Sequence, residues 1–244
     1  MYKPIIIAHH GPSAYEKGDV LRSFEGAMRS GADMVEFDLR RTRDGVFVAY
    51  HDRFIDGKQI NELTYSGLEL AAKSDRKEIP RIDEILKLTK SKIRIDVELK
   101  EEGYETEVIA FLGNYLDKDE FVITSFHDSS LRRIKTNFPQ VRVGLLLGKP
   151  RPENLFRTRI SELFPTKRSE KAKTDFLVPH FKLLRFGFLD RAQRMNQPVF
   201  VWTVNDEKMM ARFLSDNRVE ALITDKPDVA VEIRERLVSP DSDR

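Results

Sequence analysis

The sequence contains no cysteine and no long apolar segment. Without cysteine there is no disulfide, no thiolate metal ligand and no cysteine nucleophile, so any bound metal must use oxygen or imidazole ligands. The apolar run near the N-terminus covers only residues 5–8, and no later run approaches the roughly eighteen apolar residues of a membrane-spanning helix. We therefore expect a cytoplasmic protein without stable membrane insertion.

An excess of charge of one sign is also missing. The 42 basic and 40 acidic residues leave a net charge of +2, which gives no electrostatic reason to expect a nucleic-acid partner. Hydrophobic residues make up 40% of the chain and charged residues 34%, as in a folded soluble protein rather than a disordered one. One-domain α/β barrels have about 250 residues, so residues 1–244 are predicted to form a single domain.

Short apolar runs alternate with helical patterns along the whole chain. The predicted strands begin at residues 5, 34, 93, 120, 141, 175, 199 and 221. Eight strand–helix units in this length predict an α/β fold, a (β/α)8 TIM barrel. The alternative, an open doubly wound sheet, lacks a glycine-rich phosphate-binding motif after the first strand.

Three segments lie outside the repeating pattern. Residues 53–80 are predicted to form a small insertion, a turn followed by a short helix. Residues 151–174 are basic and predicted to be a partly helical, solvated region, with attraction of anionic head groups as the alternative interpretation. Residues 238–244 are predicted to be a polar tail.

The chemistry of the chain is concentrated in residues 33–52. Glu36 and Asp38 lie two apart and alternate with apolar residues, so a strand would place both carboxylates on one face. A turn and a second apolar run follow, and that run ends at His51. Two acids and a histidine at the ends of extended runs indicate a metal and acid–base site. The alternative is an amphipathic hairpin with solvated acids.

The carboxyl ends of barrel strands carry the active site in this fold. The strand ends of this chain deliver His9 and His10, Glu36 and Asp38, His51, Glu98 and Lys100, Phe126 and Trp202. Three adjacent carboxylates repel one another unless a cation is bound, so a hard divalent ion is implied, and Lys100 would offset the remaining charge. Two imidazoles can divide acid and base roles, which suits phosphoryl chemistry. Asp96, deeper on its strand, is interpreted as structural and paired with a basic neighbour, and Trp202 as either core or substrate wall.

With these residues in place, the sequence resembles the glycerophosphodiester phosphodiesterase family over nearly its whole length. The resemblance rests on AHHG at 8–11, GADMVEFDLRRTRDGVFVAYHD at 31–52, DVELK at 96–100 and the late VWTVND and ITDKPD motifs. It implies His9 and His51 as the acid–base pair, and Glu36, Asp38 and Glu98 as ligands of Ca²⁺ or Mg²⁺. It also implies that Lys100 contacts the phosphate of a small-molecule phosphodiester substrate, which is hydrolysed to glycerol 3-phosphate and an alcohol.

Two departures from the family pattern concern substrate binding. His10 stands where the family usually has arginine, a fixed bidentate phosphate donor. Gly18 and Asp19 stand in the matching stretch where the family usually has glutamate and asparagine. We therefore expect a metal-binding site with lowered activity or a shifted substrate. The alternatives are a degenerate barrel that binds a phosphorylated ligand without turnover, and a lysophospholipid-directed diesterase or a lyase. The oligomeric state is not predicted.

Overall fold

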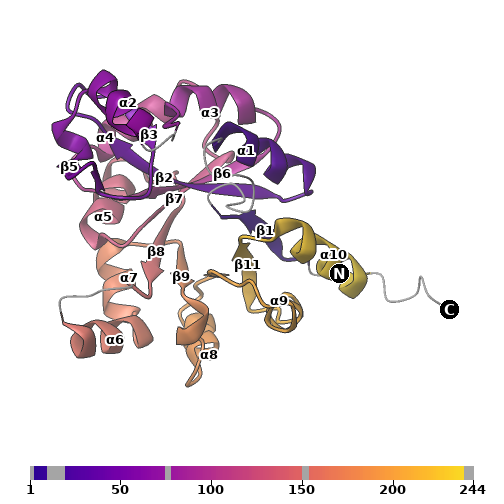
Figure 1. Ribbon diagram of the computed structural model, residues 1–244. Coiled ribbons are helices and arrows are strands. Elements are labelled where there is room, and N and C mark those ends of the chain that lie inside the picture. Colours follow the sequence, from indigo (N-terminus) through magenta and orange to yellow (C-terminus); the bar gives the residue numbers. More distant parts are fainter. Residues whose placement is uncertain (1–2, 10–19, 75–77, 150–153, 239–244) are drawn as a thin grey trace.

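Eight parallel strands close into a barrel in the computed structural model, which describes residues 3–9, 20–74, 78–149 and 154–238 (Figure 1). The strand order is β1-β11-β10-β9-β8-β7-β6-β2, and pairing of β1 with β2 closes the ring. This confirms the predicted (β/α)8 barrel. The strands are β1 Ile5–Ala8, β2 Met34–Arg41, β6 Arg94–Leu99, β7 Phe121–Ser125, β8 Val143–Leu147, β9 Phe176–Pro179, β10 Val199–Val201 and β11 Val219–Thr224.

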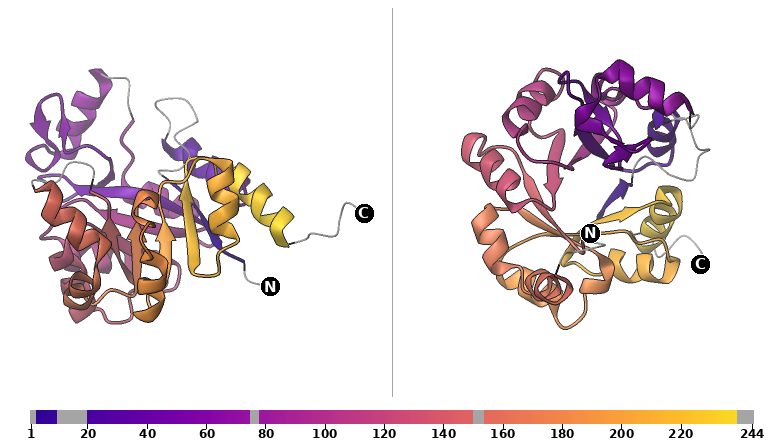
Figure 2. Two further views of the ribbon diagram at one scale, coloured as in Figure 1. Left: turned by 90° about the horizontal axis from the view of Figure 1, so that it is seen from below. Right: turned by 60° about the vertical axis from the view of Figure 1, so that its left-hand side comes forward.

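Helices surround the ring of strands, as the right-hand view of Figure 2 shows. They are α1 Val20–Arg29, α3 Ile82–Thr89, α4 Glu105–Gly113, α5 Asp128–Asn137, α7 Thr166–Ala172, α8 Phe188–Arg194, α9 Glu207–Leu214 and α10 Pro227–Val238. Val238 still belongs to α10, so the predicted tail at 238–244 begins too early, and residues 239–244 lie outside the described part. In the described ranges, no helix is both long and apolar enough to cross a membrane.

The insertion after β2 has a small hydrophobic core of its own. β3 Phe47–Ala49 pairs antiparallel with β2, and β4 Phe54–Ile55 pairs with β5 Lys58–Gln59 before η1 Ile60–Glu62 and α2 Tyr65–Ser74. Val48, Ile55, Ile60 and Leu68 pack together beneath these elements. The predicted short helix is confirmed. The two-residue strands β4 and β5 were not predicted, because a run of two residues has no periodicity to recognise.

The connection from β8 to β9 contains two helices. α6 Leu155–Leu163 precedes α7, within the basic stretch predicted to be partly helical. The buried carboxylate of Glu162 holds α6 against the end of β8, since its Oε1 accepts hydrogen bonds from the backbone N–H groups of Gly148 (2.8 Å) and Lys149 (2.9 Å). η2 Phe181–Leu183 follows β9 and leads into α8.

Side-chain alternation on β2 and β6 directs charge into the barrel. Val35, Phe37 and Leu39 face the surrounding helices within the main core, so Glu36 and Asp38 face inward. The same alternation on β6 turns Asp96 and Glu98 inward. The parallel register places Glu36 opposite Asp96 and Asp38 opposite Glu98. Thus two rungs of the ladder carry four carboxylates, as predicted for the faces of both strands.

The barrel interior away from these carboxylates is apolar and tightly packed. Phe176 and Phe200 stack with ring centroids 4.2 Å apart, and together with Ile7 and Met34 they belong to a separate buried cluster. Gly144 on β8 provides room for this stack, because a Cβ atom at Gly144 would overlap the Phe176 ring.

Replacing Gly144 with alanine is expected to destabilise the fold by about 1–3 kcal/mol, the usual effect of overpacking a filled core. Urea unfolding of the purified protein measures the change. Gly113→Ala is the matched control, since nothing lies within 4 Å of its added Cβ and it ends α4. That control should be neutral or slightly stabilising. Equal stability of the two variants would contradict the packing account.

Candidate active site

Three carboxylates converge at the carboxyl ends of β2 and β6. One oxygen from each of Glu36, Asp38 and Glu98 lies within 4.8 Å of the others. Glu36 and Asp38 are buried, and the side chain of Glu98 is 12% exposed. The ammonium of Lys100 lies 2.6 Å from Glu98 Oε1 and 3.0 Å from Asp38 Oδ1. The structure therefore brings all three predicted metal ligands and Lys100 into one cluster.

The titration of this cluster reflects burial and crowding of like charges. Burial raises the pKa of Glu98 to about 8, and the charges of Asp38 and Glu36 act in the same direction against the opposing effect of Lys100. Burial alone would lower the pKa of Lys100, but the carboxylates of Glu98 and Asp38 outweigh it and raise this pKa. Lys100 thus stays cationic, and Glu98 takes up a proton readily when no other cation neutralises the site.

The donor set fits a hard divalent cation. Carboxylate oxygens are the ligands that Ca²⁺ and Mg²⁺ prefer, and three of them from two adjacent strands form one side of a coordination shell. Lys100 supplies one positive charge where three negative charges meet, so a dication would bring the cluster from net negative to about neutral. Glu36, Asp38 and Glu98 are the residues that would hold it.

Asp96 differs from its predicted environment. It is fully buried, its Oδ1 accepts a hydrogen bond from the Thr124 hydroxyl at 2.9 Å, and no basic side chain pairs with it among the described residues. Burial raises its pKa well above the usual value, and the facing charge of Glu36 raises it further. The predicted basic neighbour is therefore wrong, because the inward positions around Asp96 carry a hydroxyl and further acids.

His9 is oriented by a carboxylate from the other end of the chain. Its Nδ1 lies 2.7 Å from Asp225 Oδ1, and its Nε2 lies 4.0 Å from Glu36 Oε2. Asn205 donates from Nδ2 to Asp225, and its Oδ1 accepts from the backbone N–H of Asp225 at 2.9 Å. Asp225 therefore fixes the imidazole with one nitrogen toward the acid cluster, an arrangement typical of an oriented acid–base catalyst.

His51 reaches the same cavity from the loop after β3. Its Nδ1 lies 2.8 Å from Asp52 Oδ1, and both side chains are 64% exposed. The loop is anchored at its backbone, because the buried guanidinium of Arg40 donates from Nη2 to the His51 carbonyl at 2.8 Å and also pairs with Glu101. The two predicted catalytic histidines therefore lie in one site, His9 more enclosed than His51.

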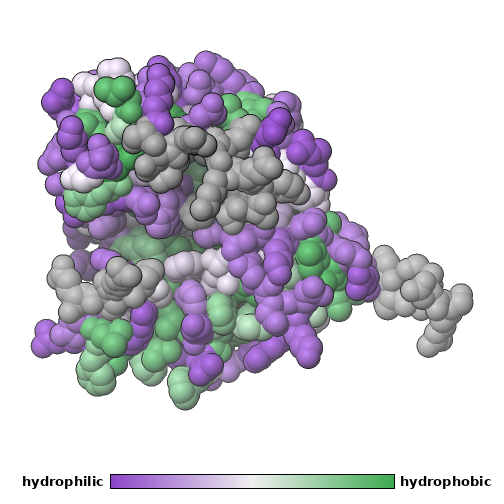
Figure 3. All heavy atoms as spheres, viewed as in Figure 1, coloured by the Kyte–Doolittle hydropathy of each residue, from purple (hydrophilic) through white to green (hydrophobic). Residues whose placement is uncertain are grey.

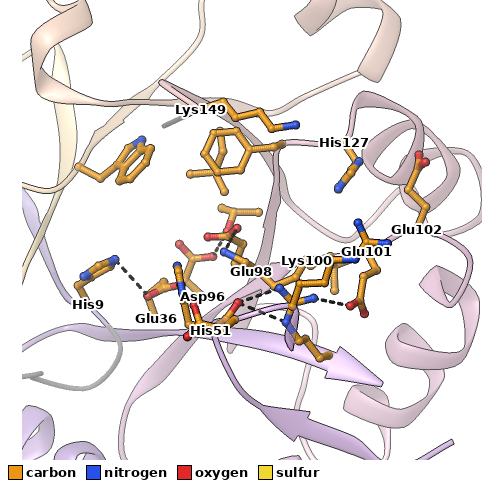
Figure 4. A pocket seen from close by; sticks show the side chains of 18 of the residues that line it. His9, Glu36, His51, Asp96, Glu98, Lys100, Glu101, Glu102, His127 and Lys149 are labelled. Carbon is orange, nitrogen blue, oxygen red and sulfur yellow. Dashed lines mark hydrogen bonds and ion pairs between the residues drawn. The ribbon is translucent and has the colours of Figure 1, made fainter. Parts of the chain in front are cut away.

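One cavity of about 1010 Å³ contains these groups (Figure 4). His9, His51 and the carboxylates of Glu36 and Glu98 point into it, and His127 and Lys149 lie across from them. Four apolar residues also line the cavity: Phe126, Leu146, Trp202 and Ile223.

The aromatic wall is rigidly held. Phe126 and Trp202 meet edge to face at 5.9 Å, and the Trp202 indole N–H donates to the carbonyls of Val178 (2.8 Å) and Leu147 (3.2 Å). Lys100, Phe126 and Trp202, three of the four residues predicted to bind substrate, thus line the cavity. The predicted contact of His10, and the departures at Gly18 and Asp19, lie outside the described residues.

Asp225 and Arg40 are the site residues that sequence reasoning missed. Asp225 follows the end of β11 directly, so the rule that strand ends carry the site also applied to it. Its role depends on contact with His9 across 216 positions of sequence. Arg40 lies two residues after Asp38 on β2, so the same alternation that turns Glu36 and Asp38 inward also predicts an inward Arg40.

The comparisons with known proteins agree with one another. The profile of the Glycerophosphoryl diester phosphodiesterase family matches residues 9–229. A glycerophosphodiester phosphodiesterase of Caldanaerobacter subterraneus subsp. tengcongensis is 25% identical over 250 residues, which cover 95% of this chain and 98% of that protein. The crystal structure of a glycerophosphodiester phosphodiesterase from Parabacteroides distasonis has a TM-score of 0.80 at 25% identity, covering 98% of this chain and 100% of that one.

A phosphodiesterase of Oleispira antarctica, solved in complex with the product sn-glycerol-3-phosphate, shares the fold. Its TM-score is 0.75 at 22% identity, and the match covers 96% of this chain and 97% of that one. The family profile spans most of the chain, including every described residue of the acid cluster and both histidines. The chain belongs to the glycerophosphoryl diester phosphodiesterase family.

Proposed function

We propose that this protein is a metal-dependent phosphodiesterase that hydrolyses glycerophosphodiesters to glycerol 3-phosphate and an alcohol. The observation that carries the proposal is the convergence, in one cavity, of three carboxylates, Lys100 and a carboxylate-oriented His9. The product complex of the Oleispira antarctica phosphodiesterase supports the glycerol 3-phosphate half of this assignment. The family match supports the class of reaction.

The chain's own residues divide the proton transfers. His9 and His51 flank the acid cluster, so one imidazole accepts the proton of the attacking hydroxyl and the other donates a proton to the leaving alkoxide. Lys100 places a fixed positive charge beside the position of the phosphate oxygens. A divalent ion held by Glu36, Asp38 and Glu98 would supply further stabilisation of charge on those oxygens.

The alcohol portion of the substrate has two surfaces to contact. Phe126, Leu146 and Trp202 offer apolar surface to the CH groups of a glycerol or alkyl chain. Glu101 and Glu102 line the cavity with polar groups. A cavity of about 1010 Å³ is larger than a glycerophosphodiester with a small head group requires. This room favours lysophospholipid-directed hydrolysis as the second candidate function.

A barrel that binds a phosphorylated ligand without turnover is less well supported. Burying like-charged carboxylates beside one another is unfavourable without a counter-charge. Simple ligand binding needs only the cation of Lys100, whereas the acid cluster and the oriented His9 add groups that serve metal-assisted proton transfer.

The test measures glycerol 3-phosphate released from glycerophosphocholine and glycerophosphoethanolamine, and lysophosphatidic acid released from lysophosphatidylcholine. Each assay contains Ca²⁺, Mg²⁺, Mn²⁺ or EDTA. Release that requires a divalent ion supports the proposal, and the preferred substrate identifies the head group. Tight metal binding without turnover of any diester would overturn it in favour of the binding barrel. Accumulation of a cyclic phosphate would select the lyase.

Asp225→Asn is expected to lower kcat by about a hundredfold, with KM changed by less than about threefold. The amide keeps the size of the side chain but removes the charge that orients His9 through Nδ1. Steady-state kinetics with glycerophosphocholine separate the two constants. Asp228→Asn, an exposed carboxylate in the first turn of α10, is the matched control and should leave both unchanged. A rise in KM alone would assign Asp225 to substrate binding instead.

Metal affinity is expected to rise with pH up to about 8. Glu98 has its pKa raised to about 8, so below that pH a proton and the cation compete for the same carboxylate. One displaced proton corresponds to about a tenfold gain in affinity per pH unit. Calorimetric titration with Mn²⁺ at several pH values, in buffers of different ionisation enthalpy, measures affinity and proton release together. Equal affinity from pH 6 to 8 would contradict the competition.

A further inference from the structure

A cluster of exposed apolar side chains lies on α6 and on the loop that precedes α8. Phe156, Ile160 and Phe164 are spaced four residues apart, so they form one stripe along α6 and its end, and they are 76%, 45% and 57% exposed. Phe186 is 81% exposed. Figure 3 shows hydrophobic side chains gathered at the lower left over α6 and α8. We name Phe156, Ile160, Phe164 and Phe186 the apolar ridge.

Arg191 holds the two parts of the ridge together. Its guanidinium donates from Nη1 to the Phe186 carbonyl at 2.5 Å and from Nη2 to the Leu163 carbonyl at 2.9 Å. The same group lies 4.6 Å from the centre of the Phe164 ring. Arg191 therefore joins the end of α6, where Phe164 lies, to the backbone of Phe186.

The four side chains of the ridge are exposed, although burial of apolar side chains would favour folding. Phe186 has φ +55°, a left-handed backbone conformation that is unfavourable for a bulky residue, and its side chain gains no burial in return. Single exposed apolar residues are ordinary, but four adjoining ones indicate a contact surface.

The segment that carries the ridge is positively charged. Residues 154–195 contain ten basic and four acidic residues, a net charge of +6 in a chain of net charge +2. Three of those four acids are neutralised or buried: Glu162 is buried with Arg159, and Asp175 and Asp190 are paired with Lys135 and Arg218.

Two exposed arginines adjoin the ridge directly. Arg157 follows Phe156 and Arg185 precedes Phe186. Within residues 3–9, 20–74, 78–149 and 154–238, the ion pairs that residues 154–195 form are Arg159–Glu162, Arg168–Asp128, Lys135–Asp175 and Arg218–Asp190, and none of them includes Arg157 or Arg185. Apolar rings flanked by arginines match the interface of an anionic lipid surface, with the rings among acyl chains and the cations among head groups.

The ridge also lies on the side of the barrel where the cavity opens. α6 follows the carboxyl end of β8, and the Phe186 loop follows the carboxyl end of β9. Lys149 lines the cavity and is hydrogen-bonded through its backbone N–H to Glu162 of α6, and through its carbonyl to Arg159 of α6. A surface that contacts the ridge therefore lies next to the wall of the cavity.

We propose that the apolar ridge, with Arg157 and Arg185, docks the protein on membranes that contain anionic phospholipid. A second copy of the chain fits less well, because two such surfaces would bring like charges together. Protruding rings also suit a fluid lipid layer, which needs no matching pockets, better than a protein partner, which does. Docking goes beyond the proposed function and does not require turnover.

Vesicle flotation tests the proposal. The native protein is mixed with phosphatidylcholine vesicles, or with vesicles containing about 30 mol% phosphatidylglycerol, at low and high salt. We expect at least about tenfold stronger binding to the anionic vesicles at low salt, lost at high salt. Phe156→Ser combined with Phe186→Ser should weaken this binding about tenfold, and so should Arg157→Glu combined with Arg185→Glu.

Leu70→Ser is the matched control, since Leu70 on α2 is 72% exposed and lies outside the ridge. It should bind vesicles as the native protein does. Circular dichroism melting verifies that every variant is folded, and hydrolysis of water-soluble glycerophosphocholine should be unaffected by the ridge variants.

Equal binding to neutral and anionic vesicles, or native binding by both double variants, would overturn the docking proposal. So would a dimer in gel filtration that the phenylalanine variants abolish. Vesicle binding without any hydrolysis would overturn only the proposed function.

Discussion

His9→Ala is expected to lower kcat/KM for glycerophosphocholine by about 10²–10⁴-fold, the range that one positioned acid–base group contributes. His9 is the more enclosed histidine of the cavity, with its Nδ1 held by Asp225 and its Nε2 facing Glu36. Alanine removes the proton-transferring group and leaves the acid cluster in place. Initial rates at saturating divalent ion measure the loss, and metal affinity should change little.

His127→Ala provides the comparison within the same cavity. His127 occupies the N-cap position of α5 without a side-chain capping bond and lines the cavity, and no carboxylate among the described residues pairs with its ring. Its loss should reduce kcat/KM by less than tenfold. A His127 effect as large as that of His9 would remove His9 from the acid–base pair.

A substrate with a good leaving group separates the two roles. Glycerophospho-p-nitrophenol needs little protonation of its leaving oxygen, so it should restore activity to the variant that lacks the general acid and not to the variant that lacks the base. Parallel assays of His9→Ala and His51→Ala therefore assign each histidine. Equal rescue of both variants would contradict a division of roles between them.

Local patterns in the sequence predicted the parts of the site that one strand determines. Strict alternation along 34–39 and 93–99 predicted which side chains of β2 and β6 share a face, and the structure confirms both faces. The (β/α)8 barrel was predictable for the same reason, because each strand and helix has its own hydrophobic period. The predicted and observed strand starts differ by a few residues. For example, β11 was predicted to begin at residue 221 and begins at Val219.

Contacts between residues on different strands of the barrel could not be predicted from the local sequence pattern. The pairing of Asp38 with Glu98 follows from the register of β2 and β6, which the packing of the whole barrel determines. The expected basic neighbour of Asp96 was wrong because the residue that faces its Oδ1 is Thr124 on β7. The orientation of His9 by Asp225 requires closure of β1 on β11, the last strand of the chain.

Glu36→Gln is expected to abolish most metal-dependent activity while slightly raising the stability of the metal-free protein. The amide keeps the size of the side chain but removes one of three adjoining negative charges, so the cation loses a ligand and the remaining acids repel less. Metal affinity should fall by about a hundredfold, the upper end of the effect of losing a group that only supports a metal ligand. In the native protein, a cation at a hundred times its Kd should stabilise the fold by about 2.7 kcal/mol.

Thermal unfolding with and without Mn²⁺ measures the stability of the metal-free Glu36→Gln protein and its stabilisation by the cation. Assays at low and high Mn²⁺ measure how much activity a higher cation concentration restores. Glu105→Gln is the matched control: Glu105 is also a buried carboxylate, but it accepts hydrogen bonds from Ser130, Arg133 and the Gly103 N–H outside the site. Losing those charge-assisted bonds should lower stability by about 1–3 kcal/mol and leave the metal-induced shift intact. The two variants thus move stability in opposite directions, because one carboxylate is paired with donors and the other is crowded by acids. A metal-free Glu36→Gln protein less stable than the native one would mean that Glu36 serves the fold rather than a cation.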